Sequence, residues 1–183
     1  MADKLGRPLL FLACRYHILE RHITHFNKIY PSSKTSGLEN QLFKHLKSVW
    51  NDLEKDIVIL KRIETPNGTW INKQHLEAEK FYRDVIDNRI YKKDGKSRKD
   101  YQELAELSLM VVSQKDRFKF RISIHHTRFM SKALYYLKMY LLLEAIPSLS
   151  EENKKKICEM AMFVGIFYTQ WFLRAVSATA VPY

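Results

Sequence analysis

The chain has 183 residues, with 31 lysine and arginine residues against 20 aspartate and glutamate residues, and its formal net charge is +11 at pH 7. Because 46% of the residues are hydrophobic and 13% are aromatic, the chain can bury a sizeable core, which excludes a mainly disordered protein. Only 5 Gly and 5 Pro are present, which excludes collagen-like and linker-like sequences, disfavours a many-stranded all-β fold and favours helix.

The first predicted element is a short strand near the N-terminus. The segment Arg7–Cys14 is short and apolar, and we interpret Leu9–Ala13 as a buried strand, although periodicity by itself does not separate such a strand from the start of a helix. A helix is then predicted from Arg15 to about Tyr30, where Pro31 ends the pattern. Its apolar residues recur at helical spacing: Ile18, Leu19, Ile23, Phe26 and Ile29.

The middle of the chain contains four more segments with the apolar spacing of amphipathic helices. Between the first two of them, Asp56–Asn72 contains the apolar run Ile57–Leu60, and its pattern leaves open whether this run is a short strand or a covered loop. The polar stretch Arg89–Lys99 is predicted to be an exposed, mobile loop. The four predicted helices span approximately Leu38–Leu53, Lys73–Arg89, Arg98–Gln114 and Ser123–Ala145.

A last helix is predicted from about Glu151 to Ser177, with Ser150 as its N-cap and Asn153 where a capping box would have Glu or Gln. We therefore expect a mainly α protein, a single helical domain over 1–183 with at most one or two short strands. Residues 1–33 form a strand-helix segment in this prediction, and 34–183 form a helical region. The residues expected in the core are Met130, Leu134, Leu137, Leu141, Phe163, Ile166 and Phe167.

Cellular location is constrained by the cysteines and by the apolar runs. Cys14 and Cys158 are too far apart in the sequence for a dense disulfide framework, which favours a reducing compartment. The apolar run Leu9–Cys14 is shorter than the core of a secretory signal, which needs roughly 7–15 residues. The uncharged run Met160–Leu173 is shorter than the roughly 20 residues of a membrane span. We expect a nuclear or cytoplasmic protein that is not secreted and has no membrane partner.

Metal binding and catalysis have weak support. Cys14, His17, His22 and His25 are residue types that bind zinc, but on one helix Cys14 and His25 would lie about 16 Å apart, so one ion could not join all four. No nucleophile-elbow, phosphate-loop or dinucleotide motif occurs in the sequence. We predict no metal, no cofactor and no catalytic residue. The carboxylates considered for metal-assisted chemistry, all in charge-rich segments, are Glu20, Asp84, Asp87, Asp100 and Asp116.

The basic excess is concentrated in the segments Arg89–Lys99 and Lys115–Arg121, each of which contains a single acidic residue. On a helix, the four residues from Arg121 to Lys132 that belong to the predicted face would lie within an arc of about 60° and could follow a phosphate backbone, although a solvated face is an equal alternative. Nearby aromatic residues could stack on bases or fill the core: Tyr91, Tyr101, Phe118 and Phe120. The predicted nucleic-acid-binding residues are Lys92, Lys93, Arg98, Lys99, Arg121, His125, Arg128 and Lys132.

Three stretches of the sequence are similar to a known group of proteins. They are Gly6-Arg7-Pro8-Leu9-Leu10-Phe11-Leu12-Ala13-Cys14-Arg15-Tyr16-His17-Ile18-Leu19-Glu20, Lys34-Thr35-Ser36-Gly37 and His125-His126-Thr127-Arg128-Phe129-Met130-Ser131-Lys132-Ala133. In these the chain resembles transposon-derived proteins of invertebrates, whose ordering is similar to that of cut-and-paste transposases with an RNase H-like core. Cys14 and His17 match the Cys-x-x-His signature that follows the second catalytic aspartate in several transposase superfamilies, including the hAT group.

The resemblance implies a partial RNase H-like fold followed by a helical insertion, and a nucleic-acid partner, DNA in preference to RNA. It departs from the family at the catalytic Asp-Asp-Glu set, because only Asp3 precedes Cys14. We therefore expect a catalytically inactive, transposase-derived fragment that binds nucleic acid non-specifically through its basic face. A helical protein-protein interaction module is the alternative, and a metal-dependent nuclease or strand-transfer enzyme ranks third. A fragment of a larger fold would also expose apolar surface and self-associate.

Overall fold

The computed structural model describes residues 15–28, 41–53, 69–88, 92–93, 96–97, 99–113 and 130–178. The described chain is mainly helical, as predicted. Its helices are α2 (Arg15–Lys28), α3 (Gln41–Val49), α4 (Thr69–Asp87), α5 (Lys99–Ser113), α6 (Ser131–Leu141), α7 (Glu151–Phe163) and α8 (Thr169–Ala178), with the π-helical segment η2 (Val164–Tyr168) between the last two.

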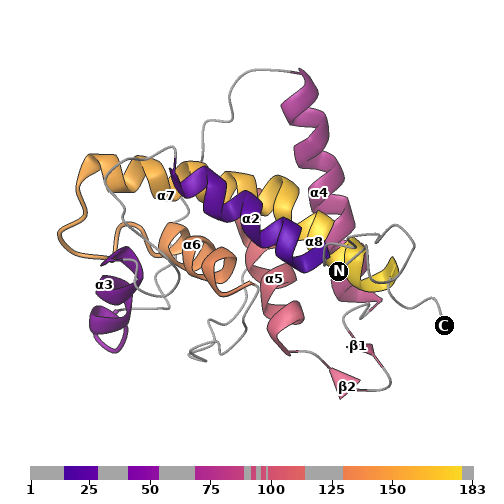
Figure 1. Ribbon diagram of the computed structural model, residues 1–183, viewed down its shortest axis with the longest axis horizontal. Helices are drawn as coiled ribbons and strands as arrows, with labels where there is room; N and C mark the ends of the chain where they lie inside the picture. The colour runs from indigo at the N-terminus through magenta and orange to yellow at the C-terminus, as the bar shows by residue number, and fades with distance from the viewer. Residues whose placement is uncertain are drawn as a thin grey trace, which may run out of the picture.

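Helix α5 is the centre of the arrangement (Figure 1). It packs against α4, α6, α7, η2 and α8, and every residue of Glu103–Ser113 is buried. A helix that is surrounded in this way is apolar on nearly all sides. The segments α7, η2 and α8 follow one another directly, and α2 lies against α8.

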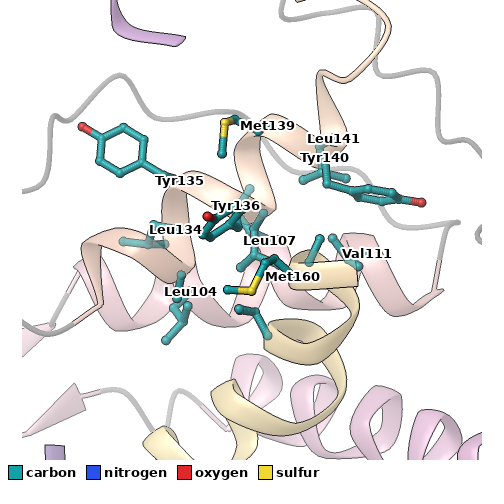
Figure 2. Packing of buried hydrophobic residues seen from close by; sticks show 14 of the residues in the cluster. Leu104, Leu107, Val111, Leu134, Tyr135, Tyr136, Met139, Tyr140, Leu141 and Met160 are labelled. Carbon is teal, nitrogen blue, oxygen red and sulfur yellow. The ribbon is translucent and has the colours of Figure 1, made fainter. Parts of the chain in front are cut away.

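The core is formed mainly by α5, α6 and α7. Figure 2 shows Leu104 and Leu107 of α5 meeting Leu134 and Tyr136 of α6 and Met160 of α7. Five of the residues predicted in the core are buried, namely Met130, Leu134, Leu137, Leu141 and Ile166.

The other two predicted core residues, Phe163 and Phe167, are only half-buried. The prediction of full burial is wrong for them because they lie on the outer side of the helix rod, where their rings contact Trp171. An apolar residue at helical spacing shows that a helix has an apolar face, but it does not show what covers that face.

The π-helical segment brings Gly165 close to α5. A Cβ atom added at Gly165 would lie 3.3 Å from Val111 Cγ1 and 3.4 Å from Val112 Cγ1, so glycine allows the two helices to approach. The backbone carbonyl of Gly165 accepts a hydrogen bond from the hydroxyl of the buried Tyr82 on α4. Three helices are therefore held together at this point.

Charged side chains also link the helices inside the molecule. Lys138 of α6 and Glu103 of α5 form an ion pair of 2.8 Å, with exposed fractions of 5% and 3%. The Lys138 ammonium also lies 5.6 Å from the centre of the Trp50 ring. The pair fixes α5 and α6 at one register, because a displacement would leave a buried charge without its counter-ion.

The predicted element boundaries agree well with these helices. The Ser150 hydroxyl accepts a hydrogen bond of 3.2 Å from the backbone N–H of Asn153, which confirms Ser150 as the N-cap of α7. Within Arg89–Lys99, predicted to be a loop, the structure contains a short antiparallel ladder that pairs β1 (Lys92–Lys93) with β2 (Lys96–Ser97). The predicted strands Leu9–Ala13 and Ile57–Leu60 lie outside the described residues. In the part of the chain that is described, no helix combines the length and hydropathy of a membrane span.

Candidate nucleic-acid interface

The predicted basic residues do not form one continuous patch where the structure describes their attachment. Lys92 and Lys93 lie on β1, before α5, and Lys99 is exposed at the first residue of α5. The second basic segment follows Ser113, at the other end of this helix, about 20 Å away at 1.5 Å per residue. Four of the predicted residues lie outside the described ranges: Arg98, Arg121, His125 and Arg128.

Lys132 does not face solvent as expected. Its ammonium lies 2.8 Å from a carboxylate oxygen of Glu20 on α2 and donates a hydrogen bond of 3.0 Å to the Thr24 hydroxyl. Its side chain is only 14% exposed. The cation that was expected to contact phosphate contacts a carboxylate of the same chain, because the first turn of α6 packs against α2, and we leave Lys132 out of the interface.

This ion pair changes the character of α2. Glu20 is the one acidic residue in the sequence of that helix, and Lys132 neutralises it from the inner side. The exposed positions of α2 are Ile18, Arg21, His22 and His25, which are spaced three, four and seven residues apart and therefore share a face. The outer face of α2 is thus a basic surface that the sequence analysis did not single out.

A row of aromatic rings continues from this face of α2. The His22 ring lies 6.0 Å from Trp171 of α8, and Trp171 lies 5.8 Å from Phe167 of η2, all measured between ring centroids. Phe167 in turn stacks on Trp70 of α4 at 5.7 Å, with 20° between the two planes. Phe163 supports the row from beneath, at 6.1 Å from Trp171 and 6.3 Å from Phe167. We call His22, Trp171, Phe167 and Trp70 the aromatic row.

The aromatic row is open to solvent. Trp70 is 63% exposed and Trp171 is 43% exposed. Among the described residues, four large hydrophobic side chains are exposed, and Ile18 joins these two tryptophans near the row because it lies one turn from His22 on α2. Large apolar side chains that gather on one surface, instead of lying singly, mark a binding site.

The second basic segment begins beside the same surface. The ring of His75 on α4 hydrogen-bonds the backbone carbonyl of Val112, which places the C-terminal end of α5 next to the middle of α4. Trp70 lies five positions before His75, about 7.5 Å along the helix axis. The chain therefore enters the stretch that contains Lys115, Arg117, Lys119 and Arg121 close to one end of the aromatic row.

The residues considered for metal binding are not brought together. Cys14 lies outside the described residues, His17 belongs to the first turn of α2, and His22 and His25 are exposed. Over the described ranges, no group of three His, Cys, Asp or Glu side chains could hold a metal ion. Of the carboxylates considered for catalysis, Glu20 is paired with Lys132 and Asp84 is exposed on α4, whereas Asp116 is not described.

Of the aromatic residues predicted near the basic segments, the structure describes Tyr101. Its half-buried ring packs edge-on against Phe172 at 5.6 Å and an interplanar angle of 81°, so Tyr101 belongs to the core and not to a stacking surface. The sequence contained one signal for the row that was found instead. Phe163, Phe167 and Trp171 follow one another at four-residue intervals, which places aromatic rings on one side of a helix.

Comparison of the chain with protein-family models, with curated proteins and with solved structures finds no match. The similarity to transposases therefore stays a prediction from the sequence. The argument about function depends on the geometry of α2, the aromatic row and the basic segments.

Proposed function

We propose that the protein binds nucleic acid without reading its sequence, and that it has no catalytic activity of its own. The observation that carries this proposal is the basic outer face of α2, with the aromatic row beside it, in a chain of net charge +11. Arg21 supplies a fixed positive charge, and the His22 and His25 rings supply hydrogen-bond donors at the same surface. Side chains of these types contact phosphates and position a protein on a nucleic acid without specifying bases.

The internal pairing of Glu20 supports this proposal. A carboxylate on the outer face of α2 would repel phosphate, and Lys132 holds the one carboxylate of this helix against α6 instead. Arg21 is the next residue after Glu20, about 100° further around the helix, and it is exposed. The Glu20–Lys132 pair thus separates one acidic and one basic residue of the same helix to its inner and outer sides.

The transposase-like features of the sequence fit the same proposal as a statement of origin. On this hypothesis the chain derives from a transposase with an RNase H-like core and retains binding without strand cleavage. Its partner is then DNA in preference to RNA, and its location is the nucleus or the cytoplasm. The basic segments Arg89–Lys99 and Lys115–Arg121 add phosphate contacts at the two ends of α5.

The test is the salt dependence of binding to a 20-base-pair duplex of arbitrary sequence, measured by fluorescence anisotropy. For the unmodified protein, the logarithm of the binding constant should fall steeply with the logarithm of the salt concentration, by about 0.9 per neutralised phosphate. Arg21→Gln should reduce that slope by a little under one unit and leave the preference among sequences unchanged.

The matched control is Lys44→Gln, which removes an exposed cation from α3, at the opposite end of the molecule from α4 and α8 (Figure 1). This variant should keep the original slope. Binding that is insensitive to salt, or an equal loss of slope in both variants, would show that the face of α2 is not the contact surface.

A further inference from the structure

The aromatic row has an energetic peculiarity that the phosphate contacts leave unexplained. A tryptophan that is 63% exposed loses most of the free energy that burial of its ring would provide, and Trp70 is in this position. Among the described residues, Phe167 is the one ring that the structure places against Trp70, and the planes are nearly parallel. The two rings thus extend the row as a flat, solvent-facing surface instead of filling the core.

The row is built from three segments that are distant in the sequence. His22 comes from α2, Phe167 and Trp171 come from the rod of η2 and α8, and Trp70 comes from the first turn of α4. Neighbouring centroids along it are 5.7, 5.8 and 6.0 Å apart. The contacts among buried residues hold this geometry, since Tyr82 of α4 donates a hydrogen bond to the carbonyl of Gly165 in η2. The surface is therefore formed before any partner arrives.

The charges around the row indicate what kind of partner covers it. Arg21 and His25 lie beside His22 at one end, and the basic segment that follows Ser113 begins near Trp70 at the other. The acidic side chains nearest in the sequence on α4 and α7 are matched by lysines, with Lys73 3.9 Å from Glu77 and Lys155 4.0 Å from Glu159. A second copy of this chain would bring another net charge of +11 and would be repelled.

Flat rings between two cationic regions suit a partner that is itself made of flat rings joined by anions. We propose that the aromatic row stacks on unpaired bases of a single-stranded nucleic acid, whose phosphates contact Arg21 at one end and the basic segment after Ser113 at the other. This inference depends on the proposed function, and it adds a preference for single strands over duplex. Every base has a face that can stack on an aromatic ring, whereas the faces of paired bases inside a duplex are covered, so only an unpaired strand gains from the row.

The experiment compares a fluorescein-labelled oligo-dT of 20 nucleotides with a 20-base-pair duplex, using the full chain and fluorescence anisotropy. Trp70→Leu and Trp171→Leu remove the indoles and keep apolar side chains at exposed positions. Each change should weaken binding of oligo-dT by at least about fivefold, because stacking of one base on an aromatic ring contributes about 1–3 kcal/mol. Duplex affinity and the salt slope should stay unchanged, since the phosphate contacts remain.

Two further variants control for altered folding and for loss of apolar surface. Trp171→Phe retains a ring and should bind oligo-dT within about twofold of the unmodified protein. Leu76→Ala shortens another exposed apolar side chain of α4, outside the row, and should leave both affinities unchanged. Far-ultraviolet circular dichroism of each variant should match that of the unmodified protein.

The possible results separate this inference from the proposed function. If the unmodified protein binds duplex and oligo-dT and the Trp→Leu variants bind oligo-dT equally well, the stacking inference is wrong and the proposed function stands. If the variants lose duplex and oligo-dT affinity equally, the preference for single strands is wrong. If the unmodified protein binds neither nucleic acid, both proposals fail, and a Trp→Leu effect on oligomeric state or on binding of an acidic protein would then identify the row as a protein-binding surface.

Discussion

Replacement of Lys138 by methionine should lower the free energy of unfolding by about 3–5 kcal/mol. Methionine keeps most of the volume of the lysine stem but leaves the Glu103 carboxylate, which is 3% exposed, without the ammonium that lies 2.8 Å from it. The contact of that ammonium with the Trp50 ring at 5.6 Å contributes about 0.5–2 kcal/mol more. Because domains have total stabilities of about 5–15 kcal/mol, the loss would be a large share of the whole.

The double variant Lys138→Met with Glu103→Leu separates the cost of an unpaired charge from the value of the pair. Removing both charges should return the stability to within about 1 kcal/mol of the unmodified protein, because the desolvation of two ions is then avoided. The matched surface control is Lys155→Met, whose ammonium lies 4.0 Å from Glu159 in an exposed i, i+4 pair and should cost less than about 1 kcal/mol.

These stabilities would be measured by urea unfolding followed by far-ultraviolet circular dichroism, with the slope of the transition compared among variants. An unchanged slope shows that the same surface is exposed on unfolding in each variant. If Lys138→Met unfolds within about 1 kcal/mol of the unmodified protein, or if the double variant is as unstable as the single one, the buried pair does not have the role described above.

Two more predictions concern alkaline pH and the cap of α7. Burial raises the pKa of Tyr82, Tyr140 and Tyr168 well above its ordinary value; the unfolded chain therefore loses these protons first above about pH 10, and stability should fall there by about 1.4 kcal/mol per pH unit for each tyrosine. Urea midpoints between pH 9 and 11.5 would show this fall, and tyrosinate absorbance that develops fully near pH 10 with the helices intact would contradict it. Ser150→Ala removes the acceptor for the Asn153 N–H and should cost about 1 kcal/mol, a decrease of about 2–4 °C in Tm, whereas Ser150→Asp should retain the cap; equal melting of Ser150→Ala and the unmodified protein would show that the cap contributes nothing.

The helices could be predicted from the sequence because the information that specifies them is local. Apolar spacing predicted α2, α4 and α5 to within a few residues at most boundaries, and Ser150 identified the start of α7. Spacing of this kind results from the 3.6-residue period of the helix and needs no knowledge of distant residues. For the same reason the strongly apolar positions Leu134 and Leu137 were predicted correctly in the core.

The surface could not be predicted in the same way because it depends on which helices lie side by side. Lys132 was expected to face solvent, and only the packing of α6 on α2 brings it to Thr24, 108 positions earlier in the sequence, and to Glu20. The same packing leaves Arg21 on the outer side of α2.

The aromatic row illustrates the division most clearly. Nothing local distinguishes Phe167, which is half-buried in the row, from Ile166, which is buried against α4 and α5, since the two are adjacent in one apolar run. The direction of each side chain follows from the helix period, but what lies in that direction follows from the fold. The sequence alone determined that this stretch is helical and apolar; the tertiary structure decided that Phe167 meets Trp70 at the surface, because a contact between residues so far apart in the chain exists only when the helices have packed.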